Sequence, residues 1–366
     1  MLQQELIKRD LLPLLTMKDG NKCTQNLWGK RREELLDILQ ENIYGYTPKA
    51  PERVMGEIVE TNKNAYAGKV LQQTIKIKFD TPKGEFSFPI HLFVPKMVQK
   101  APLFLHIAFR PDLPDRYSPI EEICDNGFAL ALFCYNDVTR DSLFGDFSDG
   151  LASMYINDSK RTPSEWGKIG MWAFGASRAL DYLLTRDEID HKNIAVIGHS
   201  RLGKTALWCA AQDERFTMSV SNNSGFGGAA IAKHGAGERV ADFIRAGSFD
   251  WYCERFKSFL GKEDFLPYDQ HFLLAAIAPR LICVGSAELD KGADPKSEFI
   301  SCYSASEVYK LLGYRGLVTP DEYPVPGTNL HDGEIGYHIR TGTHFFSRYD
   351  WNQYMQFFRA KMERGS

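Results

Sequence analysis

The sequence predicts an α/β protein built on a doubly wound, mostly parallel sheet with antiparallel strands at its N-terminal edge. Three observations support this fold class: short apolar runs recur along the chain, helix-length segments separate them, and two alternating segments precede them. Apolar runs without alternation are typical of strands buried on both faces of a parallel sheet. The expected architecture is therefore a sandwich of helices, sheet and helices.

The N-terminal third supplies the edge of this sheet. A helical region is expected around residues 27–41. Residues 70–79 and 84–94 alternate between apolar and polar side chains and meet at a turn, so they predict an antiparallel strand pair. Pro- and Asp-rich stretches at 110–119 and 139–163 predict long loops over the carboxyl ends of the strands, where ligands bind.

The remaining elements follow in alternation. A helix is expected at 166–185, and the last strand, 335–340, precedes a final helix that begins near Ser347. We find no linker in the sequence, so we expect a single domain over residues 1–366, with the helical segment 1–50 packed on it. The compact apolar runs that predict buried strands are 102–109, 128–135, 194–198, 218–221 and 281–285.

Composition limits the class of protein and its partners. With 366 residues, 43% of them hydrophobic and 25% charged, the chain is long enough to bury a large core. A net charge of -3 gives no reason to expect nucleic acid or a membrane surface as a partner. The first twenty residues contain no apolar signal segment, so the chain as printed is expected in the cytoplasm, or outside the cell if a leader precedes it.

The seven cysteines are scattered and mostly lie in apolar runs. We therefore expect buried free thiols of an intracellular protein rather than a disulfide framework. The sequence contains no C-x-x-C pair and no closely spaced cluster of histidines and carboxylates. It also lacks a glycine loop in the setting needed to cradle a phosphate, so neither a metal nor another cofactor is predicted.

Residues 193–208 predict a strand that passes through Ser200 into a helix, with Gly198 and Gly203 on either side of the serine. A sharp strand-to-helix turn needs small neighbours, because it holds the serine in a strained conformation with its hydroxyl clear of the sheet. Ser200 could instead be an ordinary helix cap. The combination of strand, two glycines and helix favours a catalytic nucleophile.

A serine hydroxyl is a poor nucleophile unless a base takes its proton. His344 is the favoured base because it lies in a loop after the last strand and before the final helix. A capping or surface role for His344 is the alternative. Structural roles are expected for His106, His271, His331 and His338.

The acid that orients the base is expected after the strand at 281–287. Asp290 and Glu288 both qualify. Either could instead cap the helix that begins near Pro295, and Asp294 could do so equally well. The spacing does not separate these possibilities.

Most of the chain resembles the bacterial branch of the glucuronoyl esterases, carbohydrate esterase family 15. The motifs that carry the resemblance are residues 198–204 (GHSRLGK), 223–230 (NSGFGGAA), 269–271 (DQH), 286–290 with 293–295, and 336–340 with His344. The resemblance implies an α/β-hydrolase fold. It also implies cofactor-free hydrolysis of the ester between a (4-O-methyl)glucuronic acid of xylan and a lignin alcohol.

The resemblance also implies roles for individual residues. It places the nucleophile on Ser200, the base on His344 and an oxyanion-holding arginine on Arg201, and it implies that Lys204 and Glu238 contact the sugar hydroxyls. The residues agree with this reading. The backbone N–H and guanidinium of Arg201 could both reach a developing oxyanion, and Lys204 lies one helical turn from Ser200.

Two positions depart from the family pattern. Many members place the acid as a glutamate where this chain has Asn223, so Asp290 is preferred ahead of Glu288. Gly292 stands where the family usually has a tryptophan that packs on the uronic acid. Loss of such a platform removes about 1 kcal/mol or more of stacking and burial.

Three functions remain open. The first is a serine esterase that acts on a uronic acid ester through an acyl-enzyme on Ser200. The second is an acetylxylan or other carboxylic ester hydrolase with the same triad. The third is a catalytically silent carbohydrate-binding relative. The sequence predicts no oligomeric state.

Overall fold

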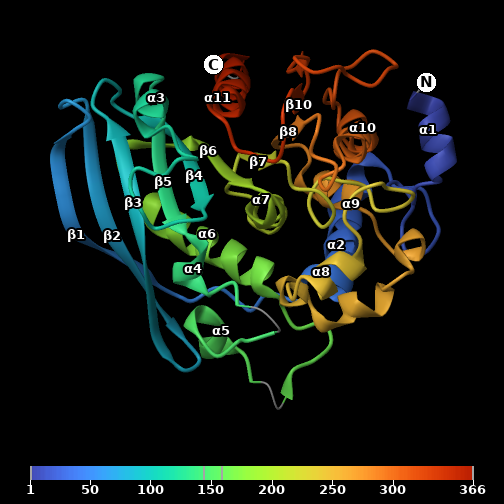
Figure 1. Ribbon diagram of the computed structural model, residues 1–366, viewed down its shortest axis with the longest axis horizontal. Coiled ribbons are helices and arrows are strands. Elements are labelled where there is room, and N and C mark those ends of the chain that lie inside the picture. The colour runs from blue at the N-terminus through green and yellow to red at the C-terminus, as the bar shows by residue number, and fades with distance from the viewer. Residues whose placement is uncertain (1, 143–144, 158–159, 365–366) are drawn as a thin grey trace.

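A mixed sheet runs through the molecule from β1, β2 and β3 at one edge to β10 and β9 at the other (Figure 1). The computed structural model describes residues 2–142, 145–157 and 160–364, and within them the sheet has ten strands in the order β1-β2-β3-β5-β4-β6-β7-β8-β10-β9. The six strands from β5 to β10 in this order are parallel to one another. The strands are β1 (Val54–Ala65), β2 (Val70–Thr81), β3 (Gly84–Pro95), β4 (Ala101–Ala108), β5 (Ala129–Cys134), β6 (Ile189–His199), β7 (Met218–Asn222), β8 (Leu281–Ala287), β9 (Asn329–Leu330) and β10 (Ile335–Arg340).

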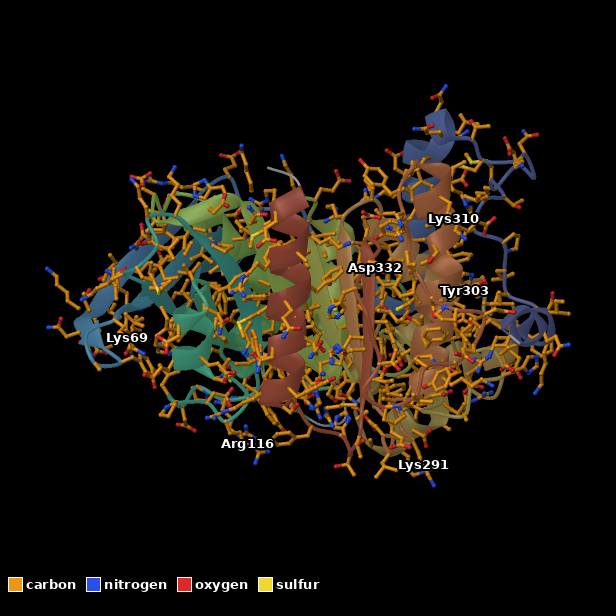
Figure 2. All side chains as sticks on the ribbon, turned by 90° about the horizontal axis from the view of Figure 1, so that it is seen from above. Lys69, Arg116, Lys291, Tyr303, Lys310 and Asp332 are labelled. Carbon is orange, nitrogen blue, oxygen red and sulfur yellow. The ribbon has the colours of Figure 1, made fainter. Side chains whose placement is uncertain are left out.

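Helices cover both faces of the sheet, which confirms the predicted doubly wound α/β class. Helices α3 and α11 lie on one face, and α11 runs along it in the view from above (Figure 2). Helices α6, α7, α9 and α10 cover the other face, with α2 packed on α9. The helices are α1 (Leu2–Arg9), α2 (Trp28–Leu39), α3 (Ile120–Asp125), α4 (Tyr135–Val138), α5 (Gly150–Tyr155), α6 (Lys168–Leu183), α7 (Arg201–Gln212), α8 (Val240–Arg245), α9 (Gln270–Ile277), α10 (Pro295–Leu311) and α11 (Arg348–Arg364).

Strand β4 shows why the buried strands lack polar alternation. Its side chains point alternately to the two faces of the sheet. Leu105 and Ile107 enter the core beneath α6 and α7, whereas Phe104 enters the core beneath α11, where its ring lies 5.5 Å from that of Trp351. Both faces are therefore apolar, as the compact runs predict.

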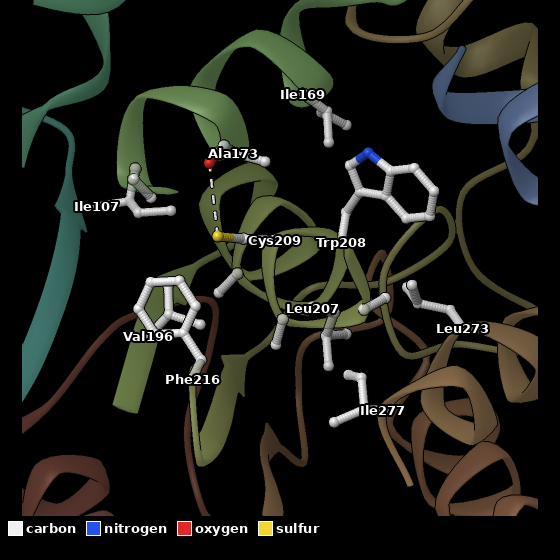
Figure 3. Close-up of a cluster of buried hydrophobic side chains, with 14 of the residues drawn as sticks. Ile107, Ile169, Ala173, Val196, Leu207, Trp208, Cys209, Phe216, Leu273 and Ile277 are labelled. Carbon is white, nitrogen blue, oxygen red and sulfur yellow. Dashed lines mark hydrogen bonds between the residues drawn. The ribbon is translucent and has the colours of Figure 1, made fainter. Parts of the chain in front are cut away.

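Helix α7 is fixed firmly behind the β6–α7 turn (Figure 3). Its Trp208 is fully buried and stacks on Tyr44 at 4.3 Å between ring centroids, while Cys209 Sγ donates a hydrogen bond to the Ala173 carbonyl of α6. Leu273 and Ile277 of α9 complete this cluster. The helix that begins at Arg201 is thus held by apolar contacts along its length, which fixes the start of the helix against the sheet.

Strand β1 and helix α5 are among the elements that the sequence did not predict. Strand β1 pairs with β2 at the sheet edge, yet most of its side chains are exposed and polar, so it carries little alternating signal. Helix α5 lies within the predicted loop 139–163, which is therefore not entirely irregular. Residues 143–144 and 158–159 of that loop lie outside the described residues.

All seven cysteines are buried free thiols, as predicted. Within the described ranges, we find no helix with the length and apolar character needed to cross a bilayer.

Candidate active site

Ser200 occupies the turn between β6 and α7. Its backbone has φ 57° and ψ -128°, a conformation that is strained for a residue with a side chain. A Cβ at Gly198 would lie 2.1 Å from the Leu202 carbonyl oxygen, so only glycine fits there. The Ser200 side chain makes no capping hydrogen bond with the helix. The geometry is therefore that of a nucleophile elbow rather than of an ordinary cap.

Asp290 and His344 come together from the ends of neighbouring strands. Asp290 follows β8, His344 follows β10, and Asp290 Oδ2 lies 2.6 Å from His344 Nδ1. Both residues line a cavity of about 220 Å³ together with Ser200. The other lining residues are Asn223, Ser224, Glu238, Gly292 and Ala293.

The tautomer of His344 follows from this contact. A carboxylate can only accept, so Nδ1 carries the proton and Nε2 keeps a lone pair. In the described structure, His344 hydrogen-bonds to Asp290 but not to Ser200. Hydrogen bonds between a nucleophile and its base often form fully only when substrate is bound. Burial alone would raise the pKa of Asp290, but the hydrogen bonds from His344 and Asn223 outweigh it and lower that pKa.

The structure separates the two candidate acids, Asp290 and Glu288, from the candidate helix cap, Asp294. Asp294 caps α10 by accepting from the Ser297 amide at 3.2 Å, which leaves Asp290 free of that task. Glu288 is exposed and lines a different groove, beside Lys291 and Tyr323. Of the three, only Asp290 hydrogen-bonds to His344.

Asn223 contacts Asp290, the candidate acid, although its own side chain is an amide. Its Nδ2 donates to Asp290 Oδ2 at 2.8 Å. Its backbone has φ 49°, a left-handed conformation that asparagine tolerates better than most residues. Position 223 thus holds an amide that contacts the candidate acid after β8.

Arg201 lies at the first position of α7, where a cation opposes the helix dipole. The carboxylate of Asp141 compensates for this by pairing with Arg201 Nη1. The guanidinium lies over the Trp251 ring, 4.4 Å from its centroid, and Trp251 Nε1 donates to Asp141 Oδ1 at 2.6 Å. Sequence reasoning missed Asp141 and Trp251, although Asp141 belongs to the Asp-rich stretch predicted to lie over the strands.

Lys204 and Glu238 form an ion pair beside the cavity. Lys204 is buried, and its Nζ donates to Glu238 Oε2 at 2.9 Å and to the Phe226 carbonyl at 2.5 Å. Glu238 lines the cavity, whereas Lys204 is not among its lining residues. Glu238 therefore faces the cavity directly, and Lys204 lies behind it.

Backbone hydrogen bonds continue the sheet beyond the strand ends. The Ser200 amide donates to the Asn222 carbonyl and the Asn223 amide to the Gly285 carbonyl, each at 2.8 Å. Two further bonds of 2.9 Å run from Glu288 N to Arg340 O and from Leu289 N to Gly342 O. The segments that carry Ser200, Asp290 and His344 are thus connected to one another by backbone hydrogen bonds.

Arg340 holds the loop that carries His344. Its guanidinium donates to the carbonyls of Thr343 and Phe345, on either side of the histidine, and its Nε donates to the buried Asp350 at 2.9 Å. No role for either residue followed from the sequence, because the contacts depend on how the 341–347 turn folds back onto α11.

Comparisons with known proteins identify the family of this chain. A family model described as "Glucuronyl esterase, fungi" matches residues 83–313. A carbohydrate esterase from an unknown prokaryotic organism is 33% identical over 396 aligned residues, which cover 96% of this chain and 89% of the relative.

Two solved structures each superpose with a TM-score of 0.86 at 32% identity. One is described as a promiscuous carbohydrate esterase family 15 (CE15) esterase from the marine bacterial metagenome, with 95% of this chain and 96% of that one covered. The other is a glucuronoyl esterase from Solibacter usitatus, with 96% and 97% covered. This chain therefore belongs to the glucuronoyl esterases of carbohydrate esterase family 15, carboxylic ester hydrolases with the α/β-hydrolase fold.

Proposed function

We propose that the protein is a serine esterase that hydrolyses the ester of (4-O-methyl)glucuronic acid in xylan through an acyl-enzyme on Ser200. One observation carries the proposal: the Asp290–His344 pair and the strained Ser200 line the same cavity, and Glu238 faces it. The cavity volume of about 220 Å³ suits one sugar residue rather than a polymer. The xylan chain and the alcohol then extend outside it.

In the acylation step, His344 Nε2 takes the Ser200 hydroxyl proton while Oγ attacks the ester carbonyl carbon. The tetrahedral oxyanion accepts a hydrogen bond from the backbone N–H of Arg201, the first residue of α7. The positive charge of the Arg201 guanidinium also stabilises it. Collapse of this intermediate breaks the bond to the alcohol oxygen, which takes the proton from His344. Asp290 stabilises the imidazolium throughout the step.

In the deacylation step, His344 takes a proton from water as the water oxygen attacks the acyl carbon of the ester on Ser200. The second tetrahedral intermediate releases the uronic acid and returns the proton to Oγ. Glu238 accepts hydrogen bonds from the sugar hydroxyls, and Lys204 holds its carboxylate in place. No group beyond these side chains and water is required for this sequence of steps.

A second substrate class has one observation in its favour. Gly292 leaves the cavity wall without the aromatic platform that would select a uronic acid. The same machinery could then accept acetyl or other acyl groups. One related structure is itself described as that of a promiscuous esterase.

Hydrolysis of benzyl glucuronate, compared with release of acetate from acetylated xylan, tests the proposal. We expect the glucuronate ester to give the higher kcat/KM, and Ser200→Ala to abolish the burst of alcohol from an activated ester. A preference for acetylated xylan would favour the second substrate class. An unchanged burst in Ser200→Ala would overturn the serine mechanism, and no turnover of any ester would indicate a silent relative.

For the location of the enzyme we propose the cytoplasm, where it would act on imported oligosaccharides. The seven buried free thiols support a reducing compartment. Fractionation of the source cells with an antibody to the protein tests this, and recovery from the growth medium or the periplasm would overturn it.

A further inference from the structure

Three potential metal ligands converge on the α11 side of the sheet, away from the cavity of the active site. They are Cys283 on β8, His338 on β10 and His331 in the turn between β9 and β10. One ligand atom from each residue lies within 4.8 Å of the other two. Cys283 is packed in the α11-side core, and the His331 ring lies 5.3 Å from Phe357 of α11.

The pairing of β8 with β10 explains why Cys283 and His338 meet. Cys283 lies opposite Gly336, and His338 lies opposite Gly285. Cys283 and Gly285 are two residues apart on β8, and Gly336 and His338 are two residues apart on β10. The side chains of Cys283 and His338 therefore project from the same face of the sheet. A Cβ at Gly336 would lie 3.0 Å from Cys283 Sγ, so glycine at this position leaves the space into which the sulfur projects.

Each histidine of this cluster has one ring nitrogen without a hydrogen-bond partner among the described residues. His338 is fully buried; its Nε2 hydrogen-bonds to Asp350 Oδ1 at 2.9 Å, while its Nδ1 has no hydrogen-bond partner among the described residues. His331 Nε2 is likewise buried and unpaired in the described part of the chain. Buried polar atoms are normally satisfied, so two unpaired nitrogens beside one thiol indicate a site that can bind a ligand.

The contact with Asp350 prepares His338 for that ligand. A carboxylate that accepts from Nε2–H fixes the tautomer and leaves the Nδ1 lone pair free. Metal-binding histidines in proteins are usually held in this way by a carboxylate or carbonyl on the other nitrogen.

We propose that Cys283, His331 and His338 form a binding site for a divalent transition metal of the zinc class. One sulfur and two imidazole nitrogens suit Zn²⁺ or Co²⁺, whereas Mg²⁺ and Ca²⁺ prefer oxygen ligands. On binding, the Cys283 S–H bond breaks, a metal–sulfur bond forms, and the proton passes to solvent. The fourth position is left for water. The bound ion would join β8, β10 and the 331–334 turn beneath α11.

Titration of the chelator-treated full-length protein with Co²⁺ tests the site, because cobalt bound to a thiolate has a charge-transfer absorption band. We expect one equivalent to bind with this band and Zn²⁺ to displace it. Cys283→Ser should abolish the band, and His331→Gln should weaken binding at least about tenfold. The matched control is Cys124→Ser, which removes another buried thiol, on α3. This variant should leave the absorption band and the affinity for Co²⁺ unchanged.

Circular dichroism and thermal unfolding show whether each variant is folded. If Cys283→Ser does not fold, His331→Gln decides the question, since His331 is only half-buried and lies in a turn. Absence of the band in the wild-type protein would overturn the proposal. So would a band that persists in Cys283→Ser, or binding that is unaffected in His331→Gln.

Discussion

Replacing Asp290 by asparagine separates the charge of this residue from its shape. In the structure, Asp290 Oδ2 accepts from both His344 Nδ1 and Asn223 Nδ2. Two donors at one position require an acceptor there, so the amide oxygen of the introduced asparagine should take that place. The Asp290→Asn variant should therefore keep the tautomer of His344 and lose only the negative charge.

The magnitude follows from the charge pair that forms when His344 becomes an imidazolium. Two unit charges about 4 Å apart at an effective dielectric constant of about 20 attract by about 4 kcal/mol. Loss of this attraction in the transition state corresponds to a fall in kcat of about 10³-fold. If the amide turned its nitrogen toward His344 instead, the tautomer would be wrong and the loss would approach about 10⁴-fold.

Steady-state hydrolysis of benzyl glucuronate measures this effect, with Glu288→Gln as the matched control. Glu288 is exposed and makes no contact with His344 in the described structure, so its variant should retain the parent kcat. Thermal unfolding checks that Asp290→Asn is folded. If kcat in Asp290→Asn stayed within about tenfold of the parent, or if Glu288→Gln lost as much, the assignment of the acid would be refuted.

Three further predictions concern binding and stability. Glu238→Gln should raise KM for glucuronate esters with little change in kcat, and a lower kcat at unchanged KM would contradict a binding role. Gly292→Trp should lower that KM about fivefold, the equivalent of about 1 kcal/mol of stacking. The position has room for a side chain, because the atom nearest to a new Cβ is Asp290 Oδ1 at 3.9 Å. An unchanged KM would argue against a role for an aromatic platform at this position. Burial raises the pKa of Glu298 to about 8 from 4.5, so the folded state holds a proton that the unfolded state releases, and stability should fall as pH rises through this interval. Glu298→Gln should flatten that slope by up to about 1.4 kcal/mol per pH unit in urea unfolding, and an equal slope in both proteins would refute this.

The features predicted from the sequence are those whose signal is local. Buried strands such as β4 need both faces apolar, and the serine turn needs glycine at position 198 because the chain passes within contact distance of itself. These requirements leave a pattern within a few residues of sequence. Both the position of the buried strands and the position of the candidate nucleophile Ser200 could therefore be inferred from it.

Features that arise from packing between distant segments left no such pattern. Strand β1 is held by its ladder with β2, so its own side chains need not alternate. The pairing of Asp141 with Arg201 depends on how a long loop lies over α7. Spacing alone did not separate Asp290 from Glu288, because the contact of Asp290 with His344 depends on how the turns after β8 and β10 fold.

The backbone hydrogen bonds beyond the strand ends have a consequence for how heat inactivates the enzyme. Because the amides of Ser200, Asn223, Glu288 and Leu289 are each bound to the neighbouring segment, the strand ends that lead to Asp290 and His344 are held together. Their separation requires opening of the sheet itself, which is among the last parts of a domain to open. Hydrogen exchange at these four amides should accordingly be as slow as in the centre of the sheet, and catalytic competence should persist until global unfolding.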